Sequence, residues 1–350
     1  MKLPIPAIVL GATGTVGQRF IQLLERHPWF KVVAVTGSDR SIGQRYEDAC
    51  HWLMTTPIPE DIRQMRILPS EPHGVDAAIA FSALPADSAL EIEPAFARAG
   101  IAVCTNASTY RQEPDVPLLL PEVNPDHIAL IQLQRRRRGW SGLIAANPNC
   151  TITGLTIALK PIQDAFGLKQ LMLVSMQAIS GAGFPGISSY DIMDNVVPFI
   201  QGEEEKLEFE PRKMLGRLVD EEIELAEVQI SAQANRVPVV EGHTVCASIL
   251  CEAPIDASEA LQEMEAYRAP EISLGLPSTP DPVIQVRKET NRPQPRLDIQ
   301  VGRGMTTVVG RIRKDRLFHL KFVVVSHNTV RGAAGGSIYN AELLAAQNLL

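Results

Sequence analysis

Residues 5–17, IPAIVLGATGTVG, carry the strongest indication of the fold in this sequence. An apolar run from Ile5 to Leu10 ends in glycines spaced G-x-x-G-x-x-G, and apolar residues then recur at helical spacing from Val16 to Leu24. Glycines allow a tight turn and a close approach to a pyrophosphate, which the N–H groups of a helix N-terminus then bind. This order predicts a dinucleotide-binding loop, although an ordinary glycine turn between strand and helix is the alternative.

Short apolar runs continue through the first 110 residues, at 31–36, 75–81 and 101–105, and a helical pattern lies between the last two. Strands that read as continuous apolar runs and alternate with helices indicate a parallel sheet covered on both faces. We therefore expect an α/β protein whose N-terminal part is a Rossmann-type doubly wound domain.

The pattern changes after residue 170. Longer runs at 170–180, 228–237, 243–252 and 317–326 predict strands joined by Pro- and Gly-rich turns, hence a second α+β domain with a mixed sheet. We expect a charged helix over 202–227, a long loop over 268–296 and a glycine-rich stretch that becomes helical at the C-terminus. The predicted division is 1–148, completed by 331–350, for the dinucleotide-binding domain and 149–330 for a catalytic and dimerisation domain.

Composition excludes several classes of protein. Hydrophobic residues make up 45% of the 350, which argues against disorder, and a net charge of −7 argues against a nucleic-acid partner. No apolar stretch approaches the roughly 18 residues of a membrane span. Five cysteines without a C-x-x-C pair indicate neither disulfides nor a metal site, and favour a cytoplasmic location. The run Arg135–Arg138 is typical of a solvated helix end, with a nucleic-acid patch as the alternative.

The segment after the second predicted strand, Gly37-Ser38-Asp39-Arg40-Ser41, bears on the choice of cofactor. An acidic residue there favours NAD, whereas an arginine accommodates the 2′-phosphate of NADP. Ser38 and Arg40 favour NADP because a guanidinium pairs well with phosphate. Asp39 argues for NAD if its side chain points into the pocket. The prediction is NADP.

One cysteine differs from the other four in its surroundings. Cys150 lies in Asn147-Pro148-Asn149-Cys150-Thr151, directly before an apolar helical run. A helix N-terminus stabilises a thiolate and lowers the pKa of a thiol, so Cys150 is a candidate nucleophile. Free cysteine is usually a buried small hydrophobe, and we assign that role to Cys50, Cys104, Cys246 and Cys251.

A thiolate beside a nicotinamide cofactor suggests acyl chemistry through a thioester. The chain resembles the aspartate-β-semialdehyde dehydrogenases, in particular their archaeal and fungal branch. The resemblance covers essentially the whole chain through GATGTVG, SDRSIG, PNCT, SMQAISGAG (175–183), GEEEKL (202–207), NRVPVVEGHT (235–244) and HNTVRGAAGGSI. It implies reductive dephosphorylation of L-aspartyl-4-phosphate to L-aspartate-4-semialdehyde with NADPH, in biosynthesis of lysine, diaminopimelate, threonine, methionine and isoleucine.

The resemblance also implies roles for individual residues. Cys150 would be the nucleophile, Gln177 would orient the reacting group, and His243 would take the thiol proton and later protonate the hemithioacetal oxygen. The implied substrate contacts are Arg236 for the α-carboxylate, Glu203 for the amine, and Lys206, Arg111 and Asn149 for phosphate. The implied cofactor contacts are Gly11, Thr13, Gly14, Thr15, Val16, Gly17, Ser38, Arg40, Ser41, Ser82, Ser180, Gly181 and Asn328. No metal is expected.

The interval between Arg236 and His243 requires a break in the backbone. In one unbroken strand two residues seven apart would face opposite sides of the sheet. Pro238 and Gly242 lie between them and can end the strand, so that both side chains reach one cavity.

Two other functions fit the same motifs. A malonyl-CoA reductase of the same fold would share the nucleophile and cofactor. A non-catalytic regulator would keep the binding of NADP by the first domain and would have lost the chemistry. The expected partners are a small-molecule substrate and a second copy of the chain, in a homodimer or homotetramer, without nucleic acid or membrane.

Overall fold

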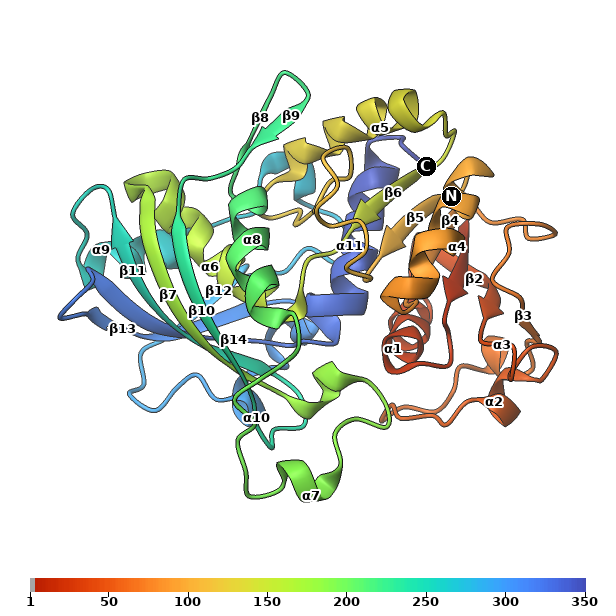
Figure 1. Cartoon of the computed structure of the whole chain (residues 1–350), viewed down its shortest axis with the longest axis horizontal. Helices are drawn as coiled ribbons and strands as arrows, with labels where there is room; N and C mark the ends of the chain where they lie inside the picture. Colours follow the sequence, from red (N-terminus) through yellow and green to blue (C-terminus); the bar gives the residue numbers. More distant parts are fainter. Residues whose placement is uncertain (1–3) are drawn as a thin grey trace.

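A six-stranded parallel sheet forms the N-terminal part of the protein, whose computed structural model describes residues 4–350 (Figure 1). The strand order is β3-β2-β1-β4-β5-β6. Strands β2 and β3 are added on one side of β1 and strands β4 to β6 on the other, and such folds bind their ligands at this switch point between β1 and β4. The strands are β1 (Ile5–Leu10), β2 (Phe30–Thr36), β3 (Ile67–Leu68), β4 (Ile79–Ser82), β5 (Ala102–Thr105) and β6 (Leu143–Ala146).

Alternate residues of these strands enter two separate cores. Ile8 and Val103 face one side with Phe96 of α4 (Ala86–Arg98), whereas Val9 and Phe81 face the other with helices α1 (Thr15–Leu24) and α11 (Gly335–Ala346). Both faces are therefore buried, which explains the continuous apolar runs in the sequence. The expected doubly wound domain is confirmed. The remaining helices of this part are α2 (Tyr46–Ala49), α3 (Glu60–Arg63) and α5 (Leu130–Arg138).

The second sheet is mixed, as expected, in the order β10-β7-β11-β14-β13-β12. β7 runs parallel to β10, and β12 runs parallel to β13. The other neighbouring pairs are antiparallel. Helices α6 (Cys150–Phe166) and α9 (Ala257–Ala266) pack on it and α8 (Glu203–Met214) contacts β10. The strands are β7 (Leu168–Gln177), β10 (Gln229–Arg236), β11 (His243–Cys251), β12 (Ile284–Arg287), β13 (Thr307–Lys314) and β14 (Leu320–Ser326).

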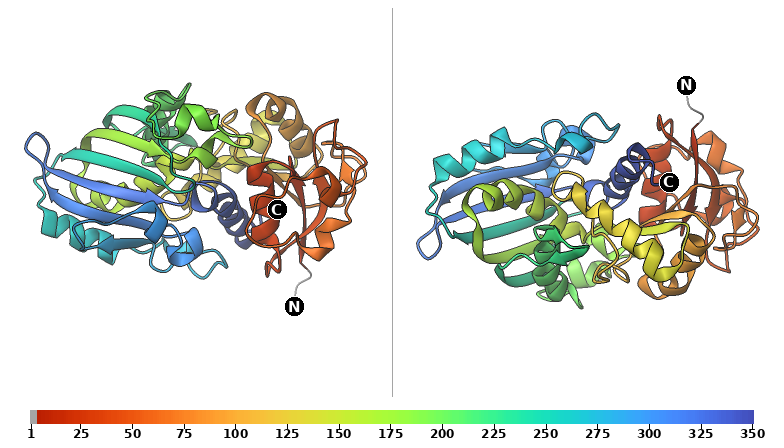
Figure 2. Two further views of the ribbon diagram at one scale, coloured as in Figure 1. Left: turned by 90° about the horizontal axis from the view of Figure 1, so that it is seen from below. Right: turned by 90° about the horizontal axis from the view of Figure 1, so that it is seen from above.

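The C-terminal segment crosses back to the first sheet (Figure 2). After β14 a π-helical turn, η5 (Val330–Ala334), leads into α11. Ala334, Ile338, Ala341 and Leu344 lie in the same core as β1 and α1. The glycines at 332, 335 and 336 lie within these helical turns, and glycine fits there because a Cβ on each would meet neighbouring atoms within 3 Å.

Two expectations for the second domain are wrong in detail. The helix predicted over 202–227 ends at Met214, and the chain continues as the hairpin β8 (Arg217–Val219) and β9 (Glu222–Glu224). Gly216 explains the break, since a Cβ there would lie 2.4 Å from the carbonyl oxygen of Glu224. The loop predicted over 268–296 contains strand β12 and the short helix α10 (Pro295–Asp298), because a four-residue strand at the sheet edge leaves little periodicity in the sequence.

The arginine run is only partly the solvated helix end that we predicted. Arg136 and Arg137 are exposed. Arg135 donates to the carbonyls of Gly142 and Leu349, and Arg138 pairs with Asp115 and lies over the ring of Trp140. The run therefore ties the end of α5 to its neighbours.

No helix among residues 4–350 combines the length and the apolar character needed to cross a membrane.

Candidate active site

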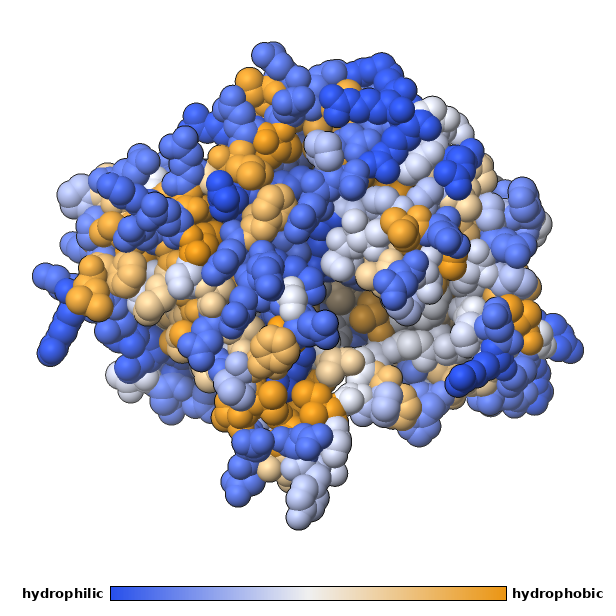
Figure 3. Space-filling model, in the orientation of Figure 1, coloured by the Kyte–Doolittle hydropathy of each residue, from blue (hydrophilic) through white to orange (hydrophobic). Residues whose placement is uncertain are grey.

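The expected catalytic residues meet at the ends of α6 and of three strands of the second sheet, and a hollow is visible near the middle of the face drawn in Figure 3. Cys150 begins α6, Gln177 ends β7, Arg236 ends β10 and His243 begins β11. The chain leaves the sheet between Arg236 and His243, as the proline and glycine in that interval predicted. Each of these side chains thus belongs to the terminus of a regular element, which holds it rigidly at the cleft.

The side chains of Cys150 and His243 form a hydrogen-bonded pair. Sγ of Cys150 lies 3.3 Å from Nε2 of His243. On the opposite side of the ring, the backbone N–H of Ala178 donates to Nδ1 at 3.0 Å. The imidazole is 1% exposed and is therefore fixed at both nitrogens within the protein.

Burial changes the titration of both groups. Burial, together with the negative charge of Glu203, raises the pKa of the Cys150 thiol to about 11 and outweighs the opposing effect of Arg111 and Arg236. Our expectation of a lowered thiol pKa at the helix N-terminus is therefore wrong for the ligand-free site. Burial also lowers the pKa of His243 to about 3, with the nearby charge of Arg236 as a second cause, so the ring is neutral at pH 7.

Arg236 and His243 are brought to the same small space. Nη1 of Arg236 donates to the carbonyl oxygen of Ala178 at 2.8 Å, and its buried Nε has no hydrogen-bond partner within the described residues. A Cβ on Gly181 would lie 2.9 Å from Nη1 of Arg236 and 3.1 Å from Nε2 of His243. Gly181 therefore leaves room for these side chains, and the unpaired Nε marks a site where an anion can bind.

A buried carboxylate organises the other side of the cysteine. Oε1 of Glu203 accepts hydrogen bonds from Gln177 Nε2 at 2.8 Å and Asn149 Nδ2 at 2.9 Å. Nζ of Lys206 lies 3.7 Å from Oε2 of Glu203, one turn along α8, so the two share a helix face as expected. Oδ1 of Asn149 accepts from the backbone N–H groups of Thr151 and Ile152. The Asn149 side chain thus caps α6 with its oxygen and holds Glu203 with one N–H of its amide.

Arg111 is engaged by the protein through both of its Nη atoms, whereas its buried Nε has no hydrogen-bond partner within the described residues. Its Nη1 pairs with Glu210 at 3.0 Å and its Nη2 donates to the carbonyl of Asn106 at 2.7 Å. The second oxygen of Glu210 accepts from the backbone N–H of Asn149 at 2.6 Å. Lys213 donates to three backbone carbonyls of the segment that carries Arg111, at residues 111, 113 and 116.

The buried roles of Glu210 and Lys213 were not predicted from the sequence. Both lie in the charged stretch that reads as a solvated helix, and both are buried, with exposed fractions of 2% and 3%. The only signal was that Glu210 follows Glu203, and Lys213 follows Lys206, by seven residues along the same helix, a spacing that identifies no partner.

The glycine loop has the shape that a dinucleotide requires. A Cβ on Gly17 would lie 2.3 Å from the carbonyl oxygen of Gly11, so the loop folds tightly against the first turn of α1. A cleft of about 620 Å³ begins there and extends to Ser180 and His327 of the second domain. Three buried polar atoms along it have no hydrogen-bond partner within residues 4–350, namely Thr15 Oγ1, Arg19 Nε and His327 Nδ1. These features fit a bound NADP or NAD.

Of the expected cofactor residues, Thr15 and Ser180 line this cleft, and the others lie outside its lining. Ser38, Asp39 and Arg40 are exposed, whereas Ser41 is buried and its hydroxyl donates to the carbonyl of Ser38. Ser82 ends β4 and is buried. Asn328 donates to Ser180 Oγ at 2.8 Å and accepts from the N–H of Gly242 at 2.8 Å, which joins the loop after β7 to the start of β11. Thr13, Gly14 and Val16 lie in the glycine loop itself.

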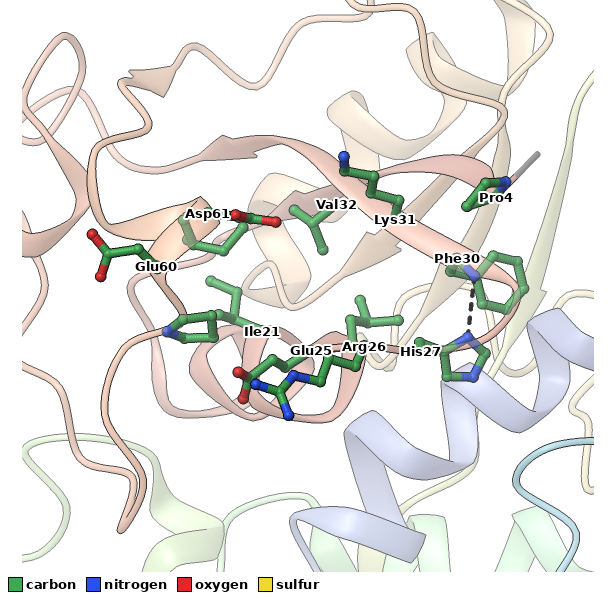
Figure 4. Close-up of a pocket in the computed structure, with 13 residues that line it drawn as sticks. Pro4, Ile21, Glu25, Arg26, His27, Phe30, Lys31, Val32, Glu60 and Asp61 are labelled. Atoms are coloured by element: carbon green, nitrogen blue, oxygen red, sulfur yellow. Dashed lines mark hydrogen bonds between the residues drawn. The ribbon is translucent and has the colours of Figure 1, made fainter.

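A separate hollow of about 350 Å³ lies on the first domain between α1, β2 and α3 (Figure 4). His27 at its rim accepts hydrogen bonds at Nδ1 from the backbone N–H groups of Trp29 and Phe30. None of the expected site residues lines it. Within residues 4–350, no group of three His, Cys, Asp or Glu side chains is placed to hold a metal.

Comparison with known proteins identifies the class to which this fold and site belong. Residues 6–131 match the model of the semialdehyde dehydrogenase NAD binding domain, and residues 159–331 match that of the semialdehyde dehydrogenase dimerisation domain. The protein is therefore a semialdehyde dehydrogenase with a cofactor domain and a dimerisation domain.

Full-length relatives narrow this class. An aspartate-semialdehyde dehydrogenase of Archaeoglobus fulgidus is 49% identical over 342 residues, which are 98% of each chain. The crystal structure of aspartate semialdehyde dehydrogenase with NADP from Candida albicans superposes with a TM-score of 0.91 at 42% identity, covering 99% of this chain and 100% of that one. Aspartate semialdehyde dehydrogenase II of Vibrio cholerae, complexed with ASA, gives 0.79 at 26% identity, over 98% and 99%. The chain belongs to the aspartate-semialdehyde dehydrogenase family, as its motifs predicted.

Proposed function

We propose that this protein reduces L-aspartyl-4-phosphate to L-aspartate-4-semialdehyde with release of phosphate, through a thioester on Cys150. The observation that carries the proposal is the hydrogen bond of 3.3 Å between Sγ of Cys150, at the start of α6, and Nε2 of His243, at the start of β11. It places a nucleophile for the acyl carbon beside a polar group that can hydrogen-bond to the acyl oxygen. The activity would serve biosynthesis of lysine, diaminopimelate, threonine, methionine and isoleucine.

We propose NADP as the cofactor, held by Gly11, Thr13, Gly14, Thr15, Val16 and Gly17 at the pyrophosphate and by Ser180, Gly181 and Asn328 near the nicotinamide. Ser38 and Arg40 would contact the 2′-phosphate, supported by their exposure next to the glycine loop, whereas Ser41 and Ser82 would shape the pocket from buried positions. Reduced NADP, when bound, supplies the two electrons that bring the acyl group to the aldehyde level.

The proposed substrate contacts are side chains whose polar atoms lack a hydrogen-bond partner or are partly exposed. Arg236 would bind the α-carboxylate, because its Nε is buried without a partner. Glu203 would bind the amine, Gln177 would orient the acyl group, and Lys206, whose side chain is 32% exposed, would bind phosphate. Arg111 and Asn149 were expected as phosphate ligands. We propose that both still contribute to the phosphate pocket, because Nε of Arg111 is buried without a hydrogen-bond partner within the described residues and one N–H of the Asn149 amide is not used by Glu203.

We propose that residues 149–330 form the catalytic and dimerisation domain, and that residues 1–148 and 331–350 together form the cofactor domain. The two sheets and the position of α11 support this division. The protein would act in the cytoplasm as a homodimer or homotetramer.

A coupled assay tests the function. NADP reduction that requires both phosphate and L-aspartate-4-semialdehyde is expected of the wild-type protein and is expected to be absent from Cys150→Ala, which should still bind NADP. Cys246→Ala, with its cysteine on the second sheet away from the cleft, is the matched control and should retain full activity. Reduction of malonyl-CoA in place of this activity would refute the proposal.

A further inference from the structure

One ion pair connects α1 of the first domain to the second domain across the cofactor cleft, the hollow of about 620 Å³ that begins at the glycine loop. Nη2 of Arg19 lies 2.6 Å from Oε1 of Glu241, a residue in the segment between β10 and β11. Both residues line the cleft, with side chains that are 12% and 25% exposed. The pair therefore joins the two walls of the cleft, and its partial burial limits the screening of its charges by salt.

The carboxylate of Glu241 also holds the segment that follows β14. Its Oε1 accepts a hydrogen bond from Oγ1 of Thr329 at 2.9 Å, and its Oε2 lies 3.6 Å from Nε2 of His327. Burial lowers the pKa of His327 to about 4, against the opposing effect of Glu241, so this imidazole is neutral at pH 7. The positive charge that faces Glu241 at this pH is therefore that of Arg19.

The guanidinium of Arg19 is held in place but keeps one free donor. Its Nη1 donates to Gln22 at 2.7 Å and its Nη2 to Glu241, whereas its buried Nε has no partner within residues 4–350. Oγ1 of Thr15, one turn earlier in α1, and Nδ1 of His327, on the opposite wall, are likewise buried and unpaired. Buried polar atoms without partners mark a place for a ligand. Because these three atoms come from both domains, their separation depends on how closely the domains are held.

We propose that Glu241 is a positioning residue for the cofactor, whose ion pair with Arg19 holds the two walls of the cleft together in the ligand-free protein. The inference rests on the proposed cofactor and goes beyond it, because Glu241 is assigned no contact with NADP or substrate. Without the pair, part of the binding energy of the cofactor must be used to close the cleft. If the closed form falls from nearly all molecules to about a tenth of them, the apparent Kd rises about tenfold.

Isothermal titration calorimetry with NADP, in the absence of substrate, tests the inference. Glu241→Gln keeps the shape of the side chain and removes its charge, and we expect its Kd for NADP to be about tenfold higher than that of the wild type. Glu221→Gln is the matched control, because it breaks a different ion pair between the domains, with Arg136 of α5, whose residues do not line the cleft. Its Kd should be unchanged. An unchanged Kd in Glu241→Gln, or an equal rise in both variants, would overturn the inference.

A double-mutant cycle shows whether Glu241 acts through Arg19. Arg19→Gln should raise the Kd at least tenfold, and the double variant should be no weaker than Arg19→Gln alone, because the pair is already broken in each single variant. Losses that multiply in the double variant would show that the residues act independently. Glu241→Asp keeps the charge and should bind NADP within about threefold of the wild type. A loss as large as that of Glu241→Gln would show that the charge is not responsible.

Hydrogen exchange followed by mass spectrometry detects the open cleft without a cofactor. The N–H of Gly242 donates to Oδ1 of Asn328 at 2.8 Å, within the two segments that Glu241 joins. In Glu241→Gln without NADP we expect faster exchange than in the wild type, confined to peptides from these segments, and a return to the wild-type rate with saturating NADP. Equal exchange in the two proteins would contradict the inference. Failure of the wild-type protein to bind NADP would instead refute the proposed cofactor, and the exchange result would still stand.

Discussion

Glu210 joins Arg111 to the residue that precedes the nucleophile. One oxygen of its carboxylate lies 3.0 Å from Nη1 of Arg111, and the other accepts the backbone N–H of Asn149 at 2.6 Å. Both side chains of the pair are buried, with exposed fractions of 9% and 2%. A single carboxylate therefore fixes the start of α6, and with it Cys150, to the first domain.

Replacing this carboxylate by an amide should destabilise the protein. In Glu210→Gln the guanidinium of Arg111 loses its counter-charge while it remains buried, and breaking one partner of a buried ion pair costs about 3–5 kcal/mol. We expect the free energy of unfolding in urea to fall by about 3 kcal/mol. Glu205→Gln, on the exposed face of α8, should change it by less than about 0.5 kcal/mol. An unchanged midpoint in Glu210→Gln would show that the pair contributes nothing.

A methyl group on Gly181 should disturb the catalytic pair without unfolding the protein. The added Cβ would lie 2.9 Å from Nη1 of Arg236 and 3.0 Å from Cε1 of His243, so both side chains must move. We expect kcat/KM to fall by about 100-fold in Gly181→Ala, as misplacement by about 1 Å can cost. Ala182→Gly loosens the same loop without adding an atom and should have a much smaller effect. If the two variants lose activity equally, loop flexibility and not crowding is responsible.

Exchanging Arg236 for lysine tests the carboxylate site. Lysine keeps the positive charge but loses the planar pair of donors. One charged hydrogen bond contributes about 1.5–3 kcal/mol, so the KM for L-aspartate-4-semialdehyde should rise about 10- to 100-fold in Arg236→Lys, with a smaller change in kcat. Arg217→Lys, at an exposed position of β8, serves as the control. A fall in kcat with an unchanged KM would place Arg236 in the chemical step instead.

The buried Glu93 should make stability depend on pH. Burial raises the pKa of its carboxyl from 4.5 to about 7 in the folded protein. Between these two values the folded state therefore binds more protons than the unfolded state, and the free energy of unfolding falls as the pH rises. The difference between these two pKa values corresponds to a change of roughly 3 kcal/mol in the free energy of unfolding.

The amide in Glu93→Gln should remove this dependence and stabilise the protein at pH 8. The side chain accepts a hydrogen bond from Thr105, and its second oxygen is buried without a partner within residues 4–350, so an uncharged group fits the site better. Urea unfolding at pH 5 and pH 8 measures the effect, with the exposed Glu91→Gln as control. A decrease of stability at pH 8 in Glu93→Gln would show that the carboxylate is charged in the folded protein.

The features that the sequence reveals are those with local causes. The glycine loop after β1, the start of α6 at Cys150 and the break between Arg236 and His243 each depend on neighbouring residues, and each is found in the structure where the sequence places it. The second sheet was likewise predictable where its strands are long, because β7, β11 and β14 keep alternating or continuous apolar patterns.

The features that were missed depend on contacts between distant segments. Nothing near Glu210 in the sequence indicates that Arg111 and Asn149, 99 and 61 residues away, will meet it. The amide of Ala178 is a backbone group, which no side-chain pattern can mark. The raised pKa of Cys150 has the same origin, because its main cause is burial between two domains and the sequence shows only the helix terminus.

The return of α11 to the first sheet also bears on how the protein is made. Ile338, Ala341 and Leu344 complete the core around β1 and α1, yet they are synthesised long after the strands of the first sheet. At about 5–20 residues per second, translation needs on the order of ten seconds or more to pass from the end of β6 to this helix. During that interval the nascent cofactor domain exposes an apolar groove over β1 and α1, which is where a chaperone would be expected to bind.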